Sequence, residues 1–89
     1  MIIAQVTGSV VSTRKMESLV GNKFMVVEPL NGMRGSGEKI VAVDNIGAGV
    51  GEYVLVTTGS SARAGSQSVD SPVDAAIVGI IDDIGNLKQ

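Results

Sequence analysis

The stretch GAGVGEYVLV, residues 47–56, decides the fold, because it joins a glycine-rich turn directly to a run of apolar residues. Glycines at alternate positions indicate a tight connection, in which the backbone takes positive φ values or passes close to other atoms. The run that follows is short, contains two β-branched valines and stops before the next glycine. Its length, composition and boundaries favour a strand over a short buried helix.

Four other segments of the chain show a related pattern. The first alternates apolar and polar residues, which predicts a strand with one buried face. The other three contain consecutive apolar residues, as in FMVV at residues 24–27 and IVAV at residues 40–43. The predicted strands cover residues 2–12, 23–30, 39–46, 53–58 and 75–84.

The segments between these strands have the composition of turns and loops. Near the last strand, Ser71, Pro72 and Asp74 fit the N-terminus of a helix, and the β-branched residues that follow limit this helix to one turn. The fold class is therefore predicted to be all-β. We expect a small closed barrel of five strands, similar to an oligonucleotide-binding fold, with one short helical turn. Residues 1–89 are expected to form a single domain.

The composition excludes several classes of function. The chain has no cysteine and no histidine, which removes disulfides, thiolate nucleophiles and histidine-based metal sites. We therefore expect no catalytic residue, no metal and no cofactor. A net charge of −2 and only two aromatic residues argue against nucleic-acid binding. The longest apolar run, residues 75–81, is too short to cross a membrane, and the absence of cysteine fits a reducing cytoplasm.

Three features invite a chemical interpretation, and each has a simpler one. The glycines of residues 47–51 lead into a strand, whereas a phosphate-binding loop needs a helix N-terminus after its glycines. Asp82 and Asp83 are adjacent in a predicted strand and would point to opposite faces. Ser60 and Ser61 have no histidine to act as a base and no lysine at the S-x-x-K spacing. An enzyme that works through carboxylates alone remains an alternative.

The apolar residues of the predicted strands are too many for a single small barrel to bury. A barrel covers only the inner face of each strand, so its strands should alternate, yet four of the five do not. No predicted helix is long enough to cover the outer face. We therefore expect a neighbouring copy of the chain to cover it.

Five blocks of the sequence, spanning nearly the whole chain, closely resemble the bacterial microcompartment vertex proteins, the family shared by ethanolamine-utilisation shells and carboxysomes. Only residues 31–38 and the tail after Asp83 look individual. The blocks are VTGSVVST at residues 6–13 followed by Lys15, DNIGAGVGE at 44–52, VLV at 54–56, GSSAR at 59–63, and PVDAAIVGIID at 72–82.

The resemblance implies a five-stranded barrel that assembles as a pentamer at the vertices of a polyhedral protein shell enclosing enzymes. Its implied partners are copies of itself and the hexameric shell proteins of the same compartment, in the bacterial cytoplasm. A flat hexagonal sheet closes into a polyhedron only when some positions are five-fold, and a cyclic ring joins one patch to a different patch on the next subunit. The alternative function is a small-ligand-binding barrel or a scaffold that recruits an enzyme.

The residues expected at subunit contacts are those of the resembling blocks that lie beside turns. The glycines would let the backbone turn tightly or approach another chain closely, and Arg63 and Asp74 would make polar contacts that fix the geometry of the ring. The candidate residues are Asp44, Gly47, Gly49, Gly51, Glu52, Ser60, Ser61, Arg63 and Asp74.

Overall fold

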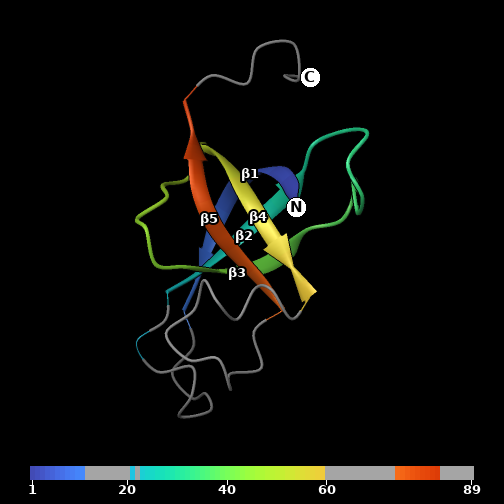
Figure 1. Cartoon of the computed structure of the whole chain (residues 1–89). Helices are drawn as coiled ribbons and strands as arrows, with labels where there is room; N and C mark the ends of the chain where they lie inside the picture. The colour runs from blue at the N-terminus through green and yellow to red at the C-terminus, as the bar shows by residue number, and fades with distance from the viewer. Residues whose placement is uncertain (12–20, 22, 60–73, 83–89) are drawn as a thin grey trace.

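The structure, a computed structural model, describes residues 1–11, 21, 23–59 and 74–82 of the chain. The described residues form five strands, one in each predicted segment. Where the bounds differ from the prediction, the observed strand is the shorter one. The strands are β1 (Ile2–Val10), β2 (Lys23–Pro29), β3 (Ile40–Asp44), β4 (Tyr53–Thr58) and β5 (Ala75–Ile81) (Figure 1).

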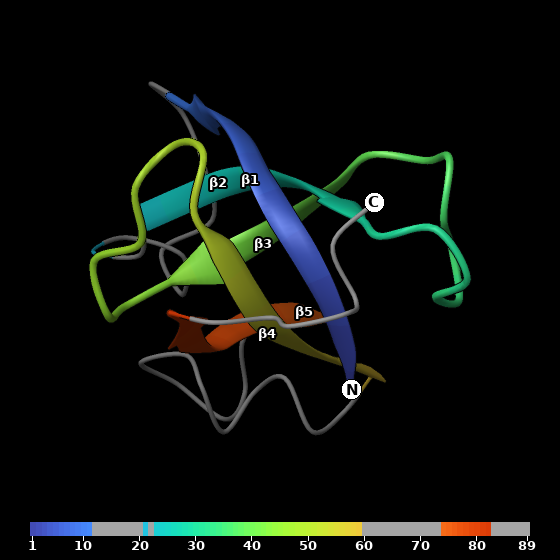
Figure 2. The same ribbon diagram turned by 90° about the horizontal axis from the view of Figure 1, so that it is seen from above.

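The five strands close into a barrel in the order β1-β2-β3-β5-β4. All neighbours are antiparallel except β3 and β5, which run parallel and pair at only two positions, Val43 with Ala76 and Asp44 with Ile77. Seen from above, β1 crosses over β2 and β3 with β4 beside it (Figure 2). The prediction of an all-β, five-stranded closed barrel is confirmed.

The described residues contain no α-helix. The predicted helical turn falls mainly on residues 71–73, which lie outside the described residues. Asp74, expected at the end of its first turn, is not helical, and β5 begins at the next residue, Ala75. At this point the β-branched residues of 75–81 and their pairing with β4 set the backbone conformation, in place of the helix-start signal.

Small aliphatic side chains fill the interior of the barrel. In β1 the alternation puts Ile2, Ala4 and Val6 inside, as the sequence predicted. Neither Phe24 nor Tyr53 belongs to this core, so the interior contains no aromatic ring. The buried cluster consists of Ile2, Ala4, Val6, Met25, Val27, Ala42, Ala48, Val54, Val56, Ala75 and Ile77, with Met33 and Ile40 packed against it.

The outer face of the barrel is apolar along β3 and β5. Val43 and Ala76 form a second buried cluster, separate from the interior, with Phe24 packed against it. Elsewhere on the same strands, Val41 before this cluster and Val78 after it are 50% and 40% exposed. The single chain therefore leaves apolar strand residues in contact with water, as expected from the lack of alternation.

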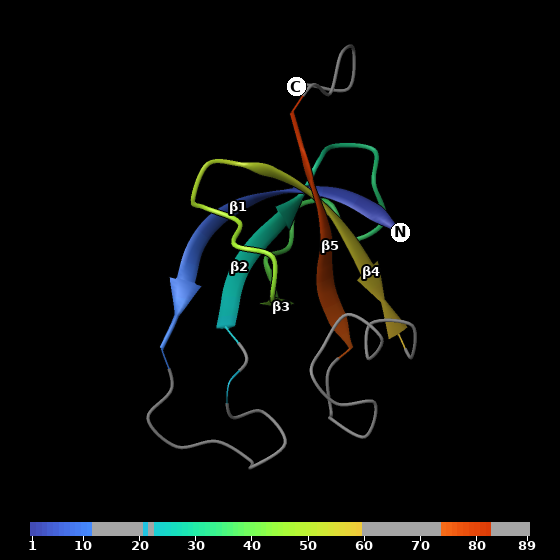
Figure 3. The ribbon, with the colours of Figure 1, turned by 60° about the vertical axis from the view of Figure 1, so that its left-hand side comes forward.

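Two connections extend from opposite sides of the barrel. Residues 30–39 join β2 to β3, and residues 45–52 join β3 to β4 (Figures 1 and 2). The second connection has to pass the end of β5, which lies between β3 and β4 in the barrel. Its arch over this end of the barrel is clearest in Figure 3. This arch carries most of the predicted site residues that the structure describes.

Candidate functional site

Asp44, at the end of β3, organises the first half of the 45–52 loop. Its side chain is only 2% exposed, and both carboxylate oxygens accept backbone hydrogen bonds. Oδ1 accepts from the N–H groups of Ile46 (3.0 Å) and Gly47 (3.1 Å), and Oδ2 accepts from the N–H of Ala48 (2.8 Å). A buried carboxylate is tolerated when several donors satisfy it. Asp44 is therefore engaged in holding the loop.

Glu52 organises the second half of the loop in a similar way. Its Oε1 accepts from the N–H of Gly49 (2.6 Å), while its own N–H donates to the carbonyl of Gly49 (3.1 Å). The backbone on either side is tied to β1, because the N–H of Gly51 donates to the carbonyl of Val6 and the N–H of Val6 donates to the carbonyl of Glu52. The loop is thus fixed at both ends and attached to the wall of the barrel.

Glycine is needed at the three positions of the loop for two different structural reasons. Gly47 and Gly51 take positive φ values of 88° and 94°, which residues with a Cβ rarely adopt. Gly49 has no positive φ, but a Cβ built on it would lie 3.3 Å from Oε1 of Glu52. β4 begins two residues after Gly51, at Tyr53, so the glycines lead into a strand and form no phosphate-binding helix start.

The loop also presents two large apolar side chains that sequence reasoning did not select. Ile46 is 48% exposed and Val50 is 65% exposed, whereas Ala48 between them is buried in the core. The signal in the sequence was Val50, a β-branched residue inside a glycine-rich connection where polar residues are usual, whereas Ile46 was included in the predicted strand of residues 39–46.

Asp74 lies away from this loop. It is exposed and precedes β5, and its backbone carbonyl accepts a hydrogen bond from the N–H of Gly59 (2.8 Å). Among the candidates, Asp44, Glu52 and the three glycines are therefore brought together, and Asp74 is separate from them. Ser60, Ser61 and Arg63 lie outside the described residues, so the expected contacts of Arg63 stay a prediction.

A shallow groove accompanies Asp74 at the junction of β3 and β5. Because these strands pair only at Val43–Ala76 and Asp44–Ile77, the first residues of β3 have no partner on β5. We call the resulting depression the seam groove. It is lined by Ile40, Val41, Thr58, Gly59, Asp74 and Ala75.

Little in the described part of the chain resembles a catalytic or metal centre. Residues 1–11, 21, 23–59 and 74–82 contain no group of three or more acidic side chains that could hold a metal ion. A second hollow, lined by Gln5, Glu28, Pro29, Leu30, Asn31 and Tyr53, is small and open. No helix among the described residues is long and apolar enough to span a membrane.

Known families and proteins match the chain along most of its length. The family described as ethanolamine utilisation protein EutN/carboxysome matches residues 1–82. The chain is 44% identical over 85 residues to the bacterial microcompartment shell vertex protein EutN of Escherichia coli, covering 94% of this chain and 90% of the relative. It is 48% identical over 85 residues to the carboxysome shell vertex protein CcmL of Synechococcus elongatus, covering 94% and 86%.

Solved structures give the same result for the fold. The GrpN pentameric microcompartment shell protein from Rhodospirillum rubrum is 46% identical, with a TM-score of 0.80 over 96% of this chain and 99% of that one. The structure of Gloeobacter violaceus CcmL is 41% identical, with a TM-score of 0.85 over 96% and 89%. The chain is thus similar to microcompartment and carboxysome shell proteins in both its sequence and its backbone fold, over nearly its whole length.

Proposed function

The chain belongs to the EutN/CcmL family, and from this membership we propose that it is a structural shell protein whose pentamers form the vertices that close a polyhedral bacterial microcompartment. The observation that carries this proposal is the likeness to pentameric GrpN over nearly the full length of both chains. At this level of identity and coverage the two subunits share their fold, and this supports a shared assembly.

The exposed surface of the single chain supports a ring. Val41, Val78 and Ile80 on the strands and Ile46 and Val50 on the loop are large apolar side chains that lie 36% to 65% exposed. A cyclic five-fold ring covers such residues by joining one surface of each subunit to a different surface of the next. An 89-residue chain without disulfides also gains stability from association.

The partners follow from the role of a vertex. A five-fold ring seals the corners between flat layers of six-fold proteins, so the hexameric shell proteins of the same compartment are its neighbours. The compartment lies in the bacterial cytoplasm, and the cysteine-free composition supports this location. The whole chain, residues 1–89, acts as one vertex domain, which is supported by a family match over residues 1–82.

The role is structural and not enzymatic. The buried carboxylate of Asp44 is occupied by three backbone N–H groups, and the sequence supplies no histidine or cysteine for acid–base or nucleophilic chemistry. Asp44, Glu52 and the glycines between them hold the loop in shape for contact with another subunit. Ser60, Ser61, Arg63 and Asp74 contribute polar contacts between subunits.

The assignment of Arg63 is tested by replacing it with alanine. If Arg63 fixes the subunit geometry, Arg63→Ala lowers the fraction of chains in closed rings at a given concentration, measured by sedimentation velocity. Unchanged rings that still close shells would remove Arg63 from the interface and leave the vertex function standing.

The vertex function itself is tested by the mass of the assembled protein. Multi-angle light scattering of the purified chain is expected to give five times the mass of one chain, in a closed particle with five-fold symmetry in electron micrographs. A monomer or dimer at micromolar concentration would contradict the vertex function and favour the alternative, a small-ligand-binding barrel or an enzyme-recruiting scaffold.

A further inference from the structure

The 45–52 loop has the properties of a preformed docking element. Ile46 and Val50 extend into water, while hydrogen bonds to Asp44, Glu52 and β1 hold the backbone that carries them. An element already fixed in its bound shape loses little conformational entropy when it docks. We call the exposed side chains of Ile46 and Val50 the loop knob.

The seam groove has complementary properties. Its floor and walls include Ile40, Val41 and Ala75, and Val41 is half exposed although it is a large apolar strand residue. Asp74 is the charged residue among those that line it. The groove therefore fits an apolar element that is accompanied by a positive charge.

A chain cannot place its own loop knob in its own seam groove. Ile40 and Val41 stand at the start of β3, and the loop follows Asp44 at its end. A strand of five residues spans roughly 15 Å, and it is too stiff to bend back on itself. The two features are therefore separate surfaces of one subunit, as the two sides of a head-to-tail contact must be.

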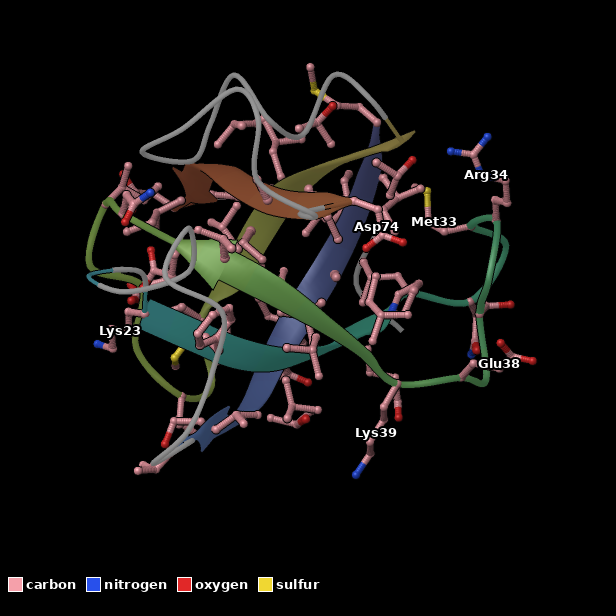
Figure 4. All side chains as sticks on the ribbon, turned by 90° about the horizontal axis from the view of Figure 1, so that it is seen from below. Lys23, Met33, Arg34, Glu38, Lys39 and Asp74 are labelled. Atoms are coloured by element: carbon pink, nitrogen blue, oxygen red, sulfur yellow. The ribbon has the colours of Figure 1, made fainter. Side chains whose placement is uncertain are left out.

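The charges on the two sides are also complementary. Lys23 is exposed and pairs in register with Asp44, so it lies beside the base of the loop knob. Asp74 is exposed at the seam groove, on the opposite side of the barrel (Figure 4). Within the described part of the chain neither has an ion-pair partner, while Arg34 on the groove side donates to the hydroxyl of Thr58 (3.0 Å).

We propose that the loop knob of one subunit docks in the seam groove of the next subunit, with Lys23 of the first facing Asp74 of the second. The occupant of the groove is a second copy of this chain. This inference rests on the proposed ring and adds to it the identity of the two surfaces that meet. It assigns Ile46, Val50 and Val41 as the residues whose burial drives the contact.

Paired cysteines test this contact on the full chain, which has no cysteine of its own. In the Val41→Cys/Val50→Cys variant, each subunit carries one thiol in the groove and one on the knob. A short-spacer bismaleimide is expected to link neighbours into a ladder of covalent dimers up to the full ring on a denaturing gel. The size-matched control is Val41→Cys/Val11→Cys, because Val11 is a valine 89% exposed at the end of β1, and it is expected to give no ladder.

The outcomes separate this inference from the proposed function. A particle of five copies without a ladder, or with an equal ladder from the control, would overturn the docking and leave the vertex function intact. Protection of a single Val41→Cys thiol even in dilute monomer would also overturn the docking, because the groove would then be covered within one chain. A ladder that ends at another number of subunits would support the docking and contradict the five-fold vertex.

A charge exchange gives an independent measurement. Lys23→Glu and Asp74→Lys are each expected to raise the subunit concentration at half assembly by about two- to fivefold, because each places like charges opposite each other. The double variant restores the original sign pairing and is expected to return to within about twofold of the parent. Additive effects in the double variant would show that the two residues do not meet.

Discussion

Among the described residues, Asp44 is the charged side chain that the fold buries, and three backbone N–H groups depend on it. Asp44→Ala leaves these donors without an acceptor near the core. We expect a loss of about 2–3 kcal/mol in the free energy of unfolding, measured by urea denaturation at fixed protein concentration. Asp82→Ala, at an exposed position after β5, is the matched control and should change stability by less than about 0.5 kcal/mol. Equal effects would contradict the capping role.

Glycine at position 51 is required by the backbone, since its φ is 94°. A Cβ added there would meet no atom within 4 Å, so a substitution adds no steric clash. Gly51→Ala is therefore expected to cost about 1–2 kcal/mol through backbone strain alone. Gly8 is the matched control, because it also has no atom within 4 Å of an added Cβ but does not take a positive φ. Gly8→Ala should leave the denaturation midpoint nearly unchanged. If both variants lose the same stability, the cost at position 51 has another source.

At the scale of an element, β5 carries two isoleucines that pair with core residues of β4 but differ in burial. Ile77, opposite Val56, is 1% exposed, whereas Ile80, opposite Val54 near the end of the strand, is 36% exposed. Ile77→Ala is expected to lower the free energy of unfolding by about 3–4 kcal/mol, through lost burial and a cavity. Ile80→Ala should cost less than about 1 kcal/mol per subunit. Urea denaturation of both variants at equal concentration measures the difference, and similar losses would mean that the two positions are equally buried.

At the scale of the whole molecule, stability and assembly are coupled, because subunit contacts cover apolar residues that the single barrel exposes. The apparent melting temperature is expected to rise by roughly 5–15 °C when the protein concentration increases a hundredfold. Calorimetric scans at several concentrations measure this dependence. A melting temperature independent of concentration would show that the barrel is stable alone and that its contacts contribute little.

The sequence by itself determined the strands, the closed barrel and the surplus of apolar residues. Alternation in residues 2–10 and the glycine-bounded runs are local signals, and they need no knowledge of distant contacts. The predicted helical turn falls mainly on residues 71–73, outside the described residues, and stays a prediction. At Asp74 local pattern did not give the start of β5, because that start depends on pairing with β4, a segment distant in the chain.

Only the tertiary structure decided which residues share a surface. The short pairing of β3 with β5 opens the seam groove, and the arch from Asp44 to Glu52 turns Ile46 and Val50 outward while Ala48 enters the core. Neither result follows from local pattern, because each depends on which residues of the closed barrel pair with a neighbouring strand and which do not. The physical reason is that the alternation of side chains along a strand decides which residues face the core. The number of residues over which two strands pair is instead decided by the packing of the whole chain.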